Sequence, residues 1–405
     1  MIAEQPAPAA ATAAPPIRLA TATGYLAFFS LGLVGTIVGA LVTALTAGWS
    51  ITLAEANVLL PVQSVGFLVG VLSADLVVRR LGRRALLSGE LAILALGALL
   101  LFLSPGLWLG LPAMFLIGIG FGGPNVGTSM FIADLYPRHR AAALNLLNVF
   151  FGLGALGAPA LVSAITTISG QGRSAVLLIT LCAALSSIGF LFMAGAAPRP
   201  PTSVRPAGLA PAPHLLTDRV VQLVLLLIFF YVAVETAFSG WMPTAAILGA
   251  GLSAAAAPLL LTTYWIAVSI CRSVVAWRGK GWAATAILRW STSVGPAGAA
   301  LLAVGMAVGQ PDVLALGAVV MGAGFAPIFP TAMALVTEVR HEAATAAAGL
   351  MTAAAARATF AGPPLVGLVL TGPGAVPAML VLFAGAALLP GVLALLHRAT
   401  LARAA

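Results

Sequence analysis

The feature that most constrains this chain is a series of apolar runs, each long enough to cross a lipid bilayer. A bilayer core about 30 Å thick requires about 20 apolar residues per helix. About twelve segments meet that requirement: 20–45, 56–78, 84–103, 108–133, 141–165, 174–196, 219–247, 255–277, 284–308, 312–337, 343–371 and 376–397. Because 61% of the residues are hydrophobic and only 7% are charged, a soluble fold could not bury this surface. The sequence therefore predicts an all-α polytopic membrane protein.

The net charge of +9 follows the loops between these segments. On one side of the expected membrane the loops carry only Arg173. The loops of the other side carry Arg18, Arg79, Arg80, Arg83, Arg84, Arg138, Arg140, Arg199, Arg205, Arg219, Arg278, Lys280, Arg340, Arg398 and Arg403. Cytoplasmic loops are enriched in Lys and Arg, so both termini and the long central loop are expected in the cytoplasm. The basicity thus indicates the topology of a cell-membrane protein rather than a nucleic-acid partner.

The chain also repeats itself at about half its length. The segment 118–162 parallels the segment 322–367, with Arg138 matching Arg340. Parallel repeats with a substrate site at their interface are the layout of one large class of secondary transporters. The expected organisation is a disordered cytoplasmic tail (1–19), a six-helix bundle (20–196), a cytoplasmic linker (197–218), a second six-helix bundle (219–397) and a short cytoplasmic tail (398–405).

The loop 79–84, RRLGRR, resembles a signature of the major facilitator superfamily, G-x-x-x-D-R-x-G-R-R, which lies between its helices 2 and 3. Four residues fit that pattern: Arg80, Gly82, Arg83 and Arg84. Arg79 stands where the aspartate belongs, and Asp75 lies one turn earlier, where an i,i+4 pair with Arg79 could replace it. The resemblance implies a twelve-helix transporter with a gate on its cytoplasmic side.

Within that superfamily the chain is most similar to the fucose permease-like branch. The segments 143–155, 231–245, 264–273 and 322–332 resemble helices 5, 7, 8 and 10 of that branch. Its proton-coupling acids in helices 1 and 4 are missing here, because 25–45 has no acid and the helix 4 glutamate falls near Gly122 and Gly123. Glu235, where fucose permease has a glutamine, is the substitute that the resemblance implies.

Two charged residues inside apolar runs mark the candidate site: Glu235 in 219–247 and Arg357 in 343–371. A charge at the bilayer centre costs about 2.5–3.5 kcal/mol on insertion scales, so it is retained where it has a partner or water. Glu235 is expected to carry a proton or accept solute hydroxyls; the alternative is a fixed ion pair between helices. Arg357 is expected to face the interface between the two halves, where it could bind solute or neutralise Glu235.

Uncharged polar and aromatic side chains complete the predicted site. Primary amides both donate and accept hydrogen bonds, which suits a hydroxylated solute, although they also join membrane helices. Aromatic rings could stack on a sugar face or mark the membrane interface. These candidates are Asn148, Asn125, Asn145, Gln63, Trp265, Tyr231 and Trp241, with Tyr264 weaker.

Charged residues at the cytoplasmic ends of the expected helices predict a gate. Its members are Asp75, Arg79, Arg80, Gly82, Arg83, Arg84, Arg272, Asp134, Arg138, Glu338 and Arg340. Arg272 is placed among them because it matches Asp75 in the internal repeat. Glu90 is expected to bond the basic loop and to have no role in transport.

A motif that suggests other chemistry lies in the wrong structural context. The segment 152–159, GLGALGAP, contains G-x-G-x-x-G, but no strand precedes it, so a nucleotide site is not expected. Metal-binding and catalytic motifs are missing, so neither an enzyme nor a bound cofactor is predicted.

We expect a monomeric secondary active transporter that takes up a sugar or similar small polar solute with a proton. A proton-coupled exporter of drugs or metabolites with the same fold stays open, as do the solute, the coupling ion and the direction.

Overall fold

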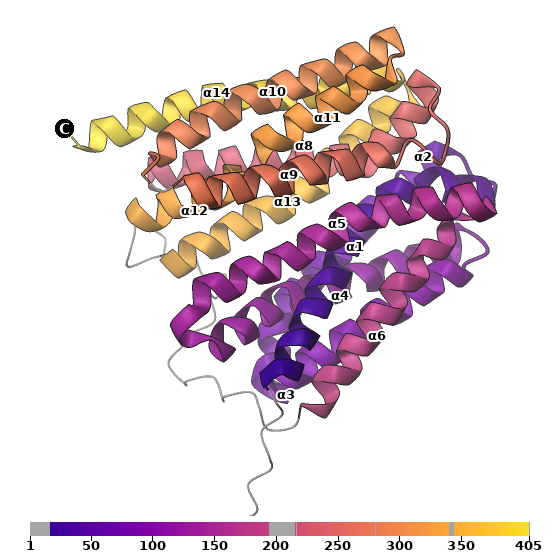
Figure 1. Ribbon diagram of the computed structural model, residues 1–405, viewed down its shortest axis with the longest axis horizontal. Coiled ribbons are helices and arrows are strands. Elements are labelled where there is room, and N and C mark those ends of the chain that lie inside the picture. Colours follow the sequence, from indigo (N-terminus) through magenta and orange to yellow (C-terminus); the bar gives the residue numbers. More distant parts are fainter. Residues whose placement is uncertain (1–16, 194–214, 216, 280, 340–343, 405) are drawn as a thin grey trace, which may run out of the picture.

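The computed structural model describes residues 17–193, 215, 217–279, 281–339 and 344–404. All regular elements in that part of the chain are helical (Figure 1). The helices are α1 (Ile17–Trp49), α2 (Leu53–Ala56), α3 (Leu59–Leu103), α4 (Leu107–Leu135), η1 (Pro137–His139), α5 (Arg140–Ser169), η2 (Gly172–Ala175), α6 (Val176–Phe192), α8 (Arg219–Ala250), α9 (Leu259–Arg278), α10 (Ala284–Val308), α11 (Pro311–Phe325), α12 (Ile328–Val339), α13 (Ala344–Thr371) and α14 (Ala375–Ala404). Across the described residues, 11 helical stretches are long and apolar enough to span a membrane.

The long helix α3 covers two of the twelve expected spans. Gly82 inside it has φ 86° and ψ 163°, which are not helical angles. That backbone region is open almost only to glycine, because a Cβ would be strained there. The chain therefore breaks at Gly82 into two helical segments, 59–81 and 83–103, which accounts for the difference between the 11 helical stretches and the twelve expected spans.

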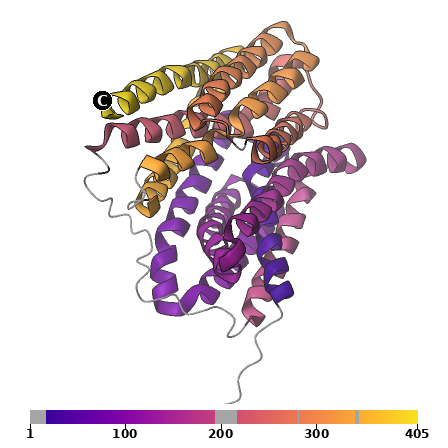
Figure 2. The same ribbon diagram turned by 60° about the vertical axis from the view of Figure 1, so that its left-hand side comes forward.

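The helices form two groups that lie side by side (Figure 1). Helices α1–α6 make up one group, which we call the amino-terminal bundle, and α8–α14 make up the carboxy-terminal bundle; the turned view separates the same two groups (Figure 2). Helix α1 packs against α8, α5 against α9, and α13 against α3. Most of the expected linker 197–218 lies outside the described residues.

Contacts between the bundles gather toward one face of the molecule. We call it the α2 face, because α2 lies there, and we call the opposite face, where α1 begins and α14 ends, the terminal face. Near the α2 face, Asn57 Nδ2 donates to the Pro364 carbonyl at 3.3 Å, and Thr262 Oγ1 donates to the Leu156 carbonyl at 3.1 Å. These contacts join α13 to the α2 segment and α9 to α5, so they hold the two bundles together on that face.

Helices α1 and α8 come closest at Gly39. A Cβ added to Gly39 would lie 1.9 Å from the Ser239 carbonyl oxygen and 2.9 Å from the Gly240 Cα. Such distances are far below van der Waals contact, so only glycine allows this approach of the two backbones. The packing between the bundles on the α2 side therefore depends on the absence of a side chain at Gly39.

The break at Gly82 leads to a stability prediction. Replacing Gly82 by alanine should lower the free energy of unfolding by about 1–3 kcal/mol, because the backbone there lies where only glycine is unstrained. The cost is conformational, since a Cβ at Gly82 would meet no other atom within 4 Å. The check is thermal unfolding in detergent, with Gly89→Ala as the matched control.

Gly89 also has open space around an added Cβ, but it lies in regular helix. Its replacement by alanine should stabilise the helix by about 0.5–1 kcal/mol. If Gly82→Ala unfolds at the same temperature as Gly89→Ala, the assigned backbone strain is wrong.

Candidate functional site

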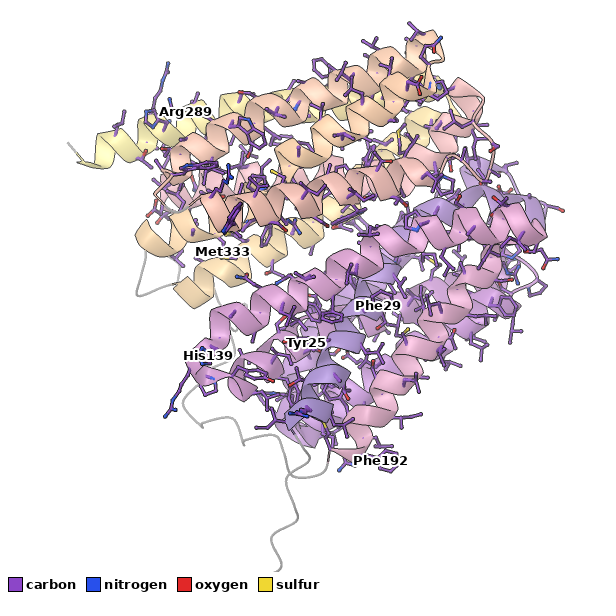
Figure 3. All side chains as sticks on the ribbon, viewed as in Figure 1. Tyr25, Phe29, His139, Phe192, Arg289 and Met333 are labelled. Carbon is purple, nitrogen blue, oxygen red and sulfur yellow. The ribbon has the colours of Figure 1, made fainter. Side chains whose placement is uncertain are left out.

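A cavity of about 1190 Å³ lies between the two bundles. Side chains near the start of α5 and residues around the start of α10, including Asn145, Trp282 and Thr285, line its outer part. Those helix starts lie at the terminal face, where His139 just before α5 is labelled in Figure 3. Gly39 and Ser239 line the inner end, where α1 and α8 touch. The cavity is therefore open toward the terminal face and closed toward the α2 face.

Glu235 on α8 projects into this cavity. It shares one face of α8 with Tyr231 and Ser239, at the i−4 and i+4 positions, and all three line the cavity. The Tyr264 hydroxyl of α9 donates a hydrogen bond to Glu235 Oε1 at 2.7 Å. The Tyr231 phenol interacts with both Glu235 and Arg272. The carboxylate thus belongs to a cluster of two phenols and one guanidinium on the wall of the carboxy-terminal bundle.

Arg272 lies on the cavity wall, and in the described structure it does not pair with Asp75; its place in a gate stays a prediction. Its Nε donates to the Ala326 carbonyl at 3.0 Å, in the break between α11 and α12. Pro330 stands four residues after Ala326 and has no backbone N–H, so that carbonyl lacks its helical donor. Arg272 supplies the missing donor. This contact holds the guanidinium beside Tyr231, which also interacts with Glu235.

Arg357 does not lie where it was predicted. Its side chain is exposed, and it is not among the residues that line the cavity. Helix α13 turns another face to the cavity, that of Thr352, Ala355, Ala356, Thr359 and Pro363. Arg357 is one residue past Ala356, which turns it about 100° away on a helix of 3.6 residues per turn. The ion pairs among the described residues are Asp75–Arg79 and Arg83–Asp134, so Arg357 does not neutralise Glu235.

All four predicted amides line the cavity, and they come from the amino-terminal bundle: Gln63, Asn125, Asn145 and Asn148. Asn148 Nδ2 donates to the Leu144 carbonyl of its own helix at 2.9 Å. The amides therefore face the charged cluster of the carboxy-terminal bundle across the cavity. A bound molecule could receive and donate hydrogen bonds on one side and meet a charge on the other.

Of the two predicted tryptophans, one lines the cavity and the other does not. Trp265 lines the cavity beside Phe151 of the other bundle, with ring centroids 6.3 Å apart, and its buried Nε1 has no hydrogen-bond partner in the described structure. Trp241 does not line the cavity, which corrects that prediction. It is fully buried between α8 and α13, where its Nε1 donates to the Pro363 carbonyl at 2.7 Å and Gly367 leaves room for its ring.

Among the predicted gate residues whose side chains the structure describes, all but Arg272 lie outside the cavity. Asp75 and Arg79 form the i,i+4 ion pair that their spacing predicts, at 2.9 Å. Asp134 pairs at 2.7 Å with Arg83, whose side chain is only 6% exposed. Of the other members, Arg84 donates to the Leu191 carbonyl, Arg80 and Arg138 are exposed, Gly82 forms the break in α3, and Arg340 and the side chain of Glu338 lie outside the described residues.

Sequence reasoning missed several hydroxyl groups of the cavity. Ser64, Ser129, Thr236 and Thr359 line it, and Tyr264 holds Glu235 although it ranked low as a candidate. Ser64 Oγ also donates to the Thr359 carbonyl at 3.4 Å, which lacks a helical donor because Pro363 follows four residues later. A proline four residues after a polar helical position was the available signal, since it marks a free carbonyl.

Comparison with known proteins finds similarity along most of the chain. A family model described as the Major Facilitator Superfamily matches residues 24–363. A glucose/mannose transporter of Bacillus subtilis is 29% identical over 146 residues, and the match covers 36% of this chain and 36% of that transporter. A niacin transporter of Acinetobacter baylyi is 30% identical over 128 residues, covering 31% of this chain and 29% of that protein. The chain therefore aligns with a minor part of these two transporters.

Longer matches exist as well. An uncharacterized transporter of Bacillus subtilis, of the same superfamily type, is 23% identical over 355 residues, which are 86% of this chain and 88% of that one. Two solved structures, of a nucleoside transporter and of a D-xylose-proton symporter, each have a TM-score of 0.74 and cover 93% of this chain. They cover 99% and 96% of their own chains, at 14% and 16% identity. At these identities the structural likeness establishes the fold alone.

Proposed function

The chain belongs to the Major Facilitator Superfamily, and from this premise we propose that it carries a sugar or a similar small polar solute across the membrane by alternating access. The observation that carries the proposal is the composition of the cavity between the bundles. Amides of the amino-terminal bundle face Glu235, Tyr231 and Arg272 of the carboxy-terminal bundle. Hydrogen-bond donors and acceptors on two opposed walls suit a compact polyhydroxylated molecule.

We further propose that Glu235 couples transport to a proton. Among the described side chains it is the one carboxylate that lines the cavity. When ionised, Glu235 accepts the hydrogen bond from the Tyr264 hydroxyl. The Tyr231 phenol interacts with both this carboxylate and the Arg272 guanidinium. Protonation removes that charge and weakens the cluster, which allows the carboxy-terminal bundle to move relative to the other. A proton taken up from one side can then leave on the other.

The proposed direction is uptake into the cytoplasm. The excess of Lys and Arg in the loops supports a cytoplasmic position for the terminal face, toward which the cavity opens. We propose that the conformation described here is the inward-facing state, which importers and exporters both visit and in which an imported solute would be released.

One observation favours a second candidate, an exporter of aromatic drugs or metabolites. Four phenylalanines line the cavity wall on the amino-terminal bundle: Phe28, Phe67, Phe121 and Phe151. With Trp265 they make part of the cavity suited to a planar apolar ring. Such a solute would still meet Glu235 and Arg272 through its polar group.

Uptake into proteoliposomes distinguishes the two candidates. The test set comprises labelled D-glucose, D-mannose, D-xylose, uridine, nicotinate and a lipophilic aromatic cation, each with and without an imposed inward proton gradient. The proposal requires that at least one of the sugars accumulates and that the gradient increases its accumulation. If no sugar accumulates and the aromatic cation is expelled, the exporter is the correct reading.

The two arginines give a paired prediction. Arg272→Gln should reduce uptake about ten- to a hundredfold, because a hydrogen bond made by a charged group contributes about 1.5–3 kcal/mol. The substitution also removes the hydrogen bond to the Ala326 carbonyl, which holds this part of the cavity wall in place. Arg357→Gln should leave uptake close to wild type, since Arg357 is exposed and away from the cavity. Initial uptake rates at matched protein density are the measurement, and equal losses in both variants would contradict the placement of the two side chains.

A further inference from the structure

Glu90 is a buried acid that the proposed transport site does not use. It lies in the second helical segment of α3, is 5% exposed, and faces α4. A Cβ added to Gly123 would lie 1.9 Å from Glu90 Oε2, so the carboxyl group occupies space that only a glycine leaves open. Glu90 does not bond the basic loop 79–84, which corrects the expectation from the sequence.

Among the residues that the structure describes, no cation forms an ion pair with Glu90. Helices α4 and α6 pack against this part of α3. The single charged residue of α4 is Asp134, which pairs with Arg83, and α6 carries no charged residue, its one titratable group being the Cys182 thiol. Glu90 Oε2 has no hydrogen-bond partner among the described atoms. The Gly123 backbone N–H interacts with the carboxyl group. An ionised carboxylate with that one donor and no cation costs several kcal/mol, whereas a neutral acid with one unpartnered oxygen costs about 1–3 kcal/mol.

Helix α4 connects Glu90 to the cavity. Gly120, Gly123 and Gly127 form its face against α3, where an added Cβ on any of them would meet α3 atoms within 3 Å. Phe121, Asn125 and Ser129 form the face that lines the cavity. Pro124 lies between the two sets and removes one helical hydrogen bond, which makes bending of α4 easier at this level. A movement of α4 that accompanies solute binding would therefore change the surroundings of Glu90.

We propose that Glu90 is a proton-binding site of the amino-terminal bundle, separate from the solute cavity and linked to it through α4. In the packing described here the carboxyl group holds its proton. When α4 moves away from α3, water reaches the group, the O–H bond breaks, and the proton passes to water while the carboxylate becomes hydrated. The proposal does not depend on which solute the cavity takes, nor on the role of Glu235.

Infrared spectroscopy of the purified full chain in lipid nanodiscs tests this directly. A protonated carboxylic acid has a carbonyl stretch distinct from that of a carboxylate. The wild type should show this band, Glu90→Gln should lack the contribution of one acid, and raising the pH should remove the same contribution from the folded wild type. Glu55→Gln is the matched control, because Glu55 is exposed, caps α2 through Thr52, and glutamine serves the same cap.

Three results decide the matter. An unchanged acid band in Glu90→Gln means that Glu90 is ionised at rest and overturns the proposal. A band that persists at every pH at which the wild type stays folded means that Glu90 is a permanently neutral packing group and overturns it too. Should Glu90→Gln not fold, Gly123→Ala replaces it: its Cβ must displace the carboxyl group, so the proposal requires a shifted acid band, and an unshifted band refutes it.

Discussion

Glu235→Gln is expected to abolish the accumulation of solute against its gradient while exchange of labelled for unlabelled solute continues. Glutamine has nearly the shape of glutamate, and its carbonyl oxygen can still accept the hydrogen bond from Tyr264. It cannot bind or release a proton, however, so an imposed proton gradient has no group in the cavity on which to act. Internal solute should rise only to the external concentration, whatever the gradient.

Parallel proteoliposome assays of accumulation and exchange measure this effect. Asp312→Asn is the control, because Asp312 is an exposed carboxylate at the start of α11, outside the cavity. It should accumulate solute as the wild type does. Accumulation that survives in Glu235→Gln would show that another group carries the proton, and loss of exchange together with accumulation would make Glu235 a solute ligand only.

Gly39→Val should open the molecule on its α2 face. The packing described here places the Gly39 Cα against the Ser239 carbonyl, and even the first carbon of a side chain would lie 1.9 Å from that oxygen. Forcing extra atoms into a packed contact costs about 1–3 kcal/mol, and every 1.4 kcal/mol changes a population ratio about tenfold. The variant should therefore shift the balance between states by roughly ten- to a hundredfold toward those in which α1 and α8 are apart.

Thiol labelling from the α2 face reports this shift. The reporter is Thr236→Cys, which lines the cavity, in a background in which Cys182 and Cys271 are replaced by serine. An impermeant reagent added on the α2 face should label the reporter faster when Gly39→Val is present. Gly48→Val is the matched control on the same helix, because a Cβ there meets no atom within 4 Å. Equal labelling rates in the two variants would contradict the assignment of Gly39 to the closing contact.

Much of the fold could be predicted from the sequence because the bilayer imposes a simple length and composition rule. Most ends of the expected spans agree with the helices within a few residues, although α14 continues to Ala404, past the expected end at 397, and the expected span 312–337 divides into α11 and α12. The two expected spans that lie within α3 are separated by the break at Gly82. The basic loop RRLGRR already contained that break, since glycine between charged residues is typical of a turn rather than of a continuous helix.

The types of residue at the candidate site could be predicted from the sequence, but the side of the helix that faces the cavity could not. Glu235 and the four amides stand out because polar groups are costly inside apolar runs, and all of them line the cavity. Arg357 stands out for the same reason, but its helix turns it away from the cavity. The cost of a buried charge says that a group requires water or a partner, and it does not say which side of the helix supplies them.

Contacts between distant helices are what the sequence left out. Arg272 reaches the free Ala326 carbonyl, and Tyr264 reaches Glu235, because α9 packs against both α11 and α8. Glu90 meets Gly123 only because two glycine-rich faces of α3 and α4 pack closely. Each of these depends on the crossing of two helices, which neither hydropathy nor spacing along one helix contains.

The most direct test of the central claim is the movement of protons during solute entry. A pH-sensitive dye outside proteoliposomes, with no gradient imposed, records the external pH when the solute identified by the uptake assay is added. The external medium should become more alkaline as the wild type takes up solute, and Glu235→Gln should give no such signal. Solute entry through the wild type with no change in external pH would contradict the account.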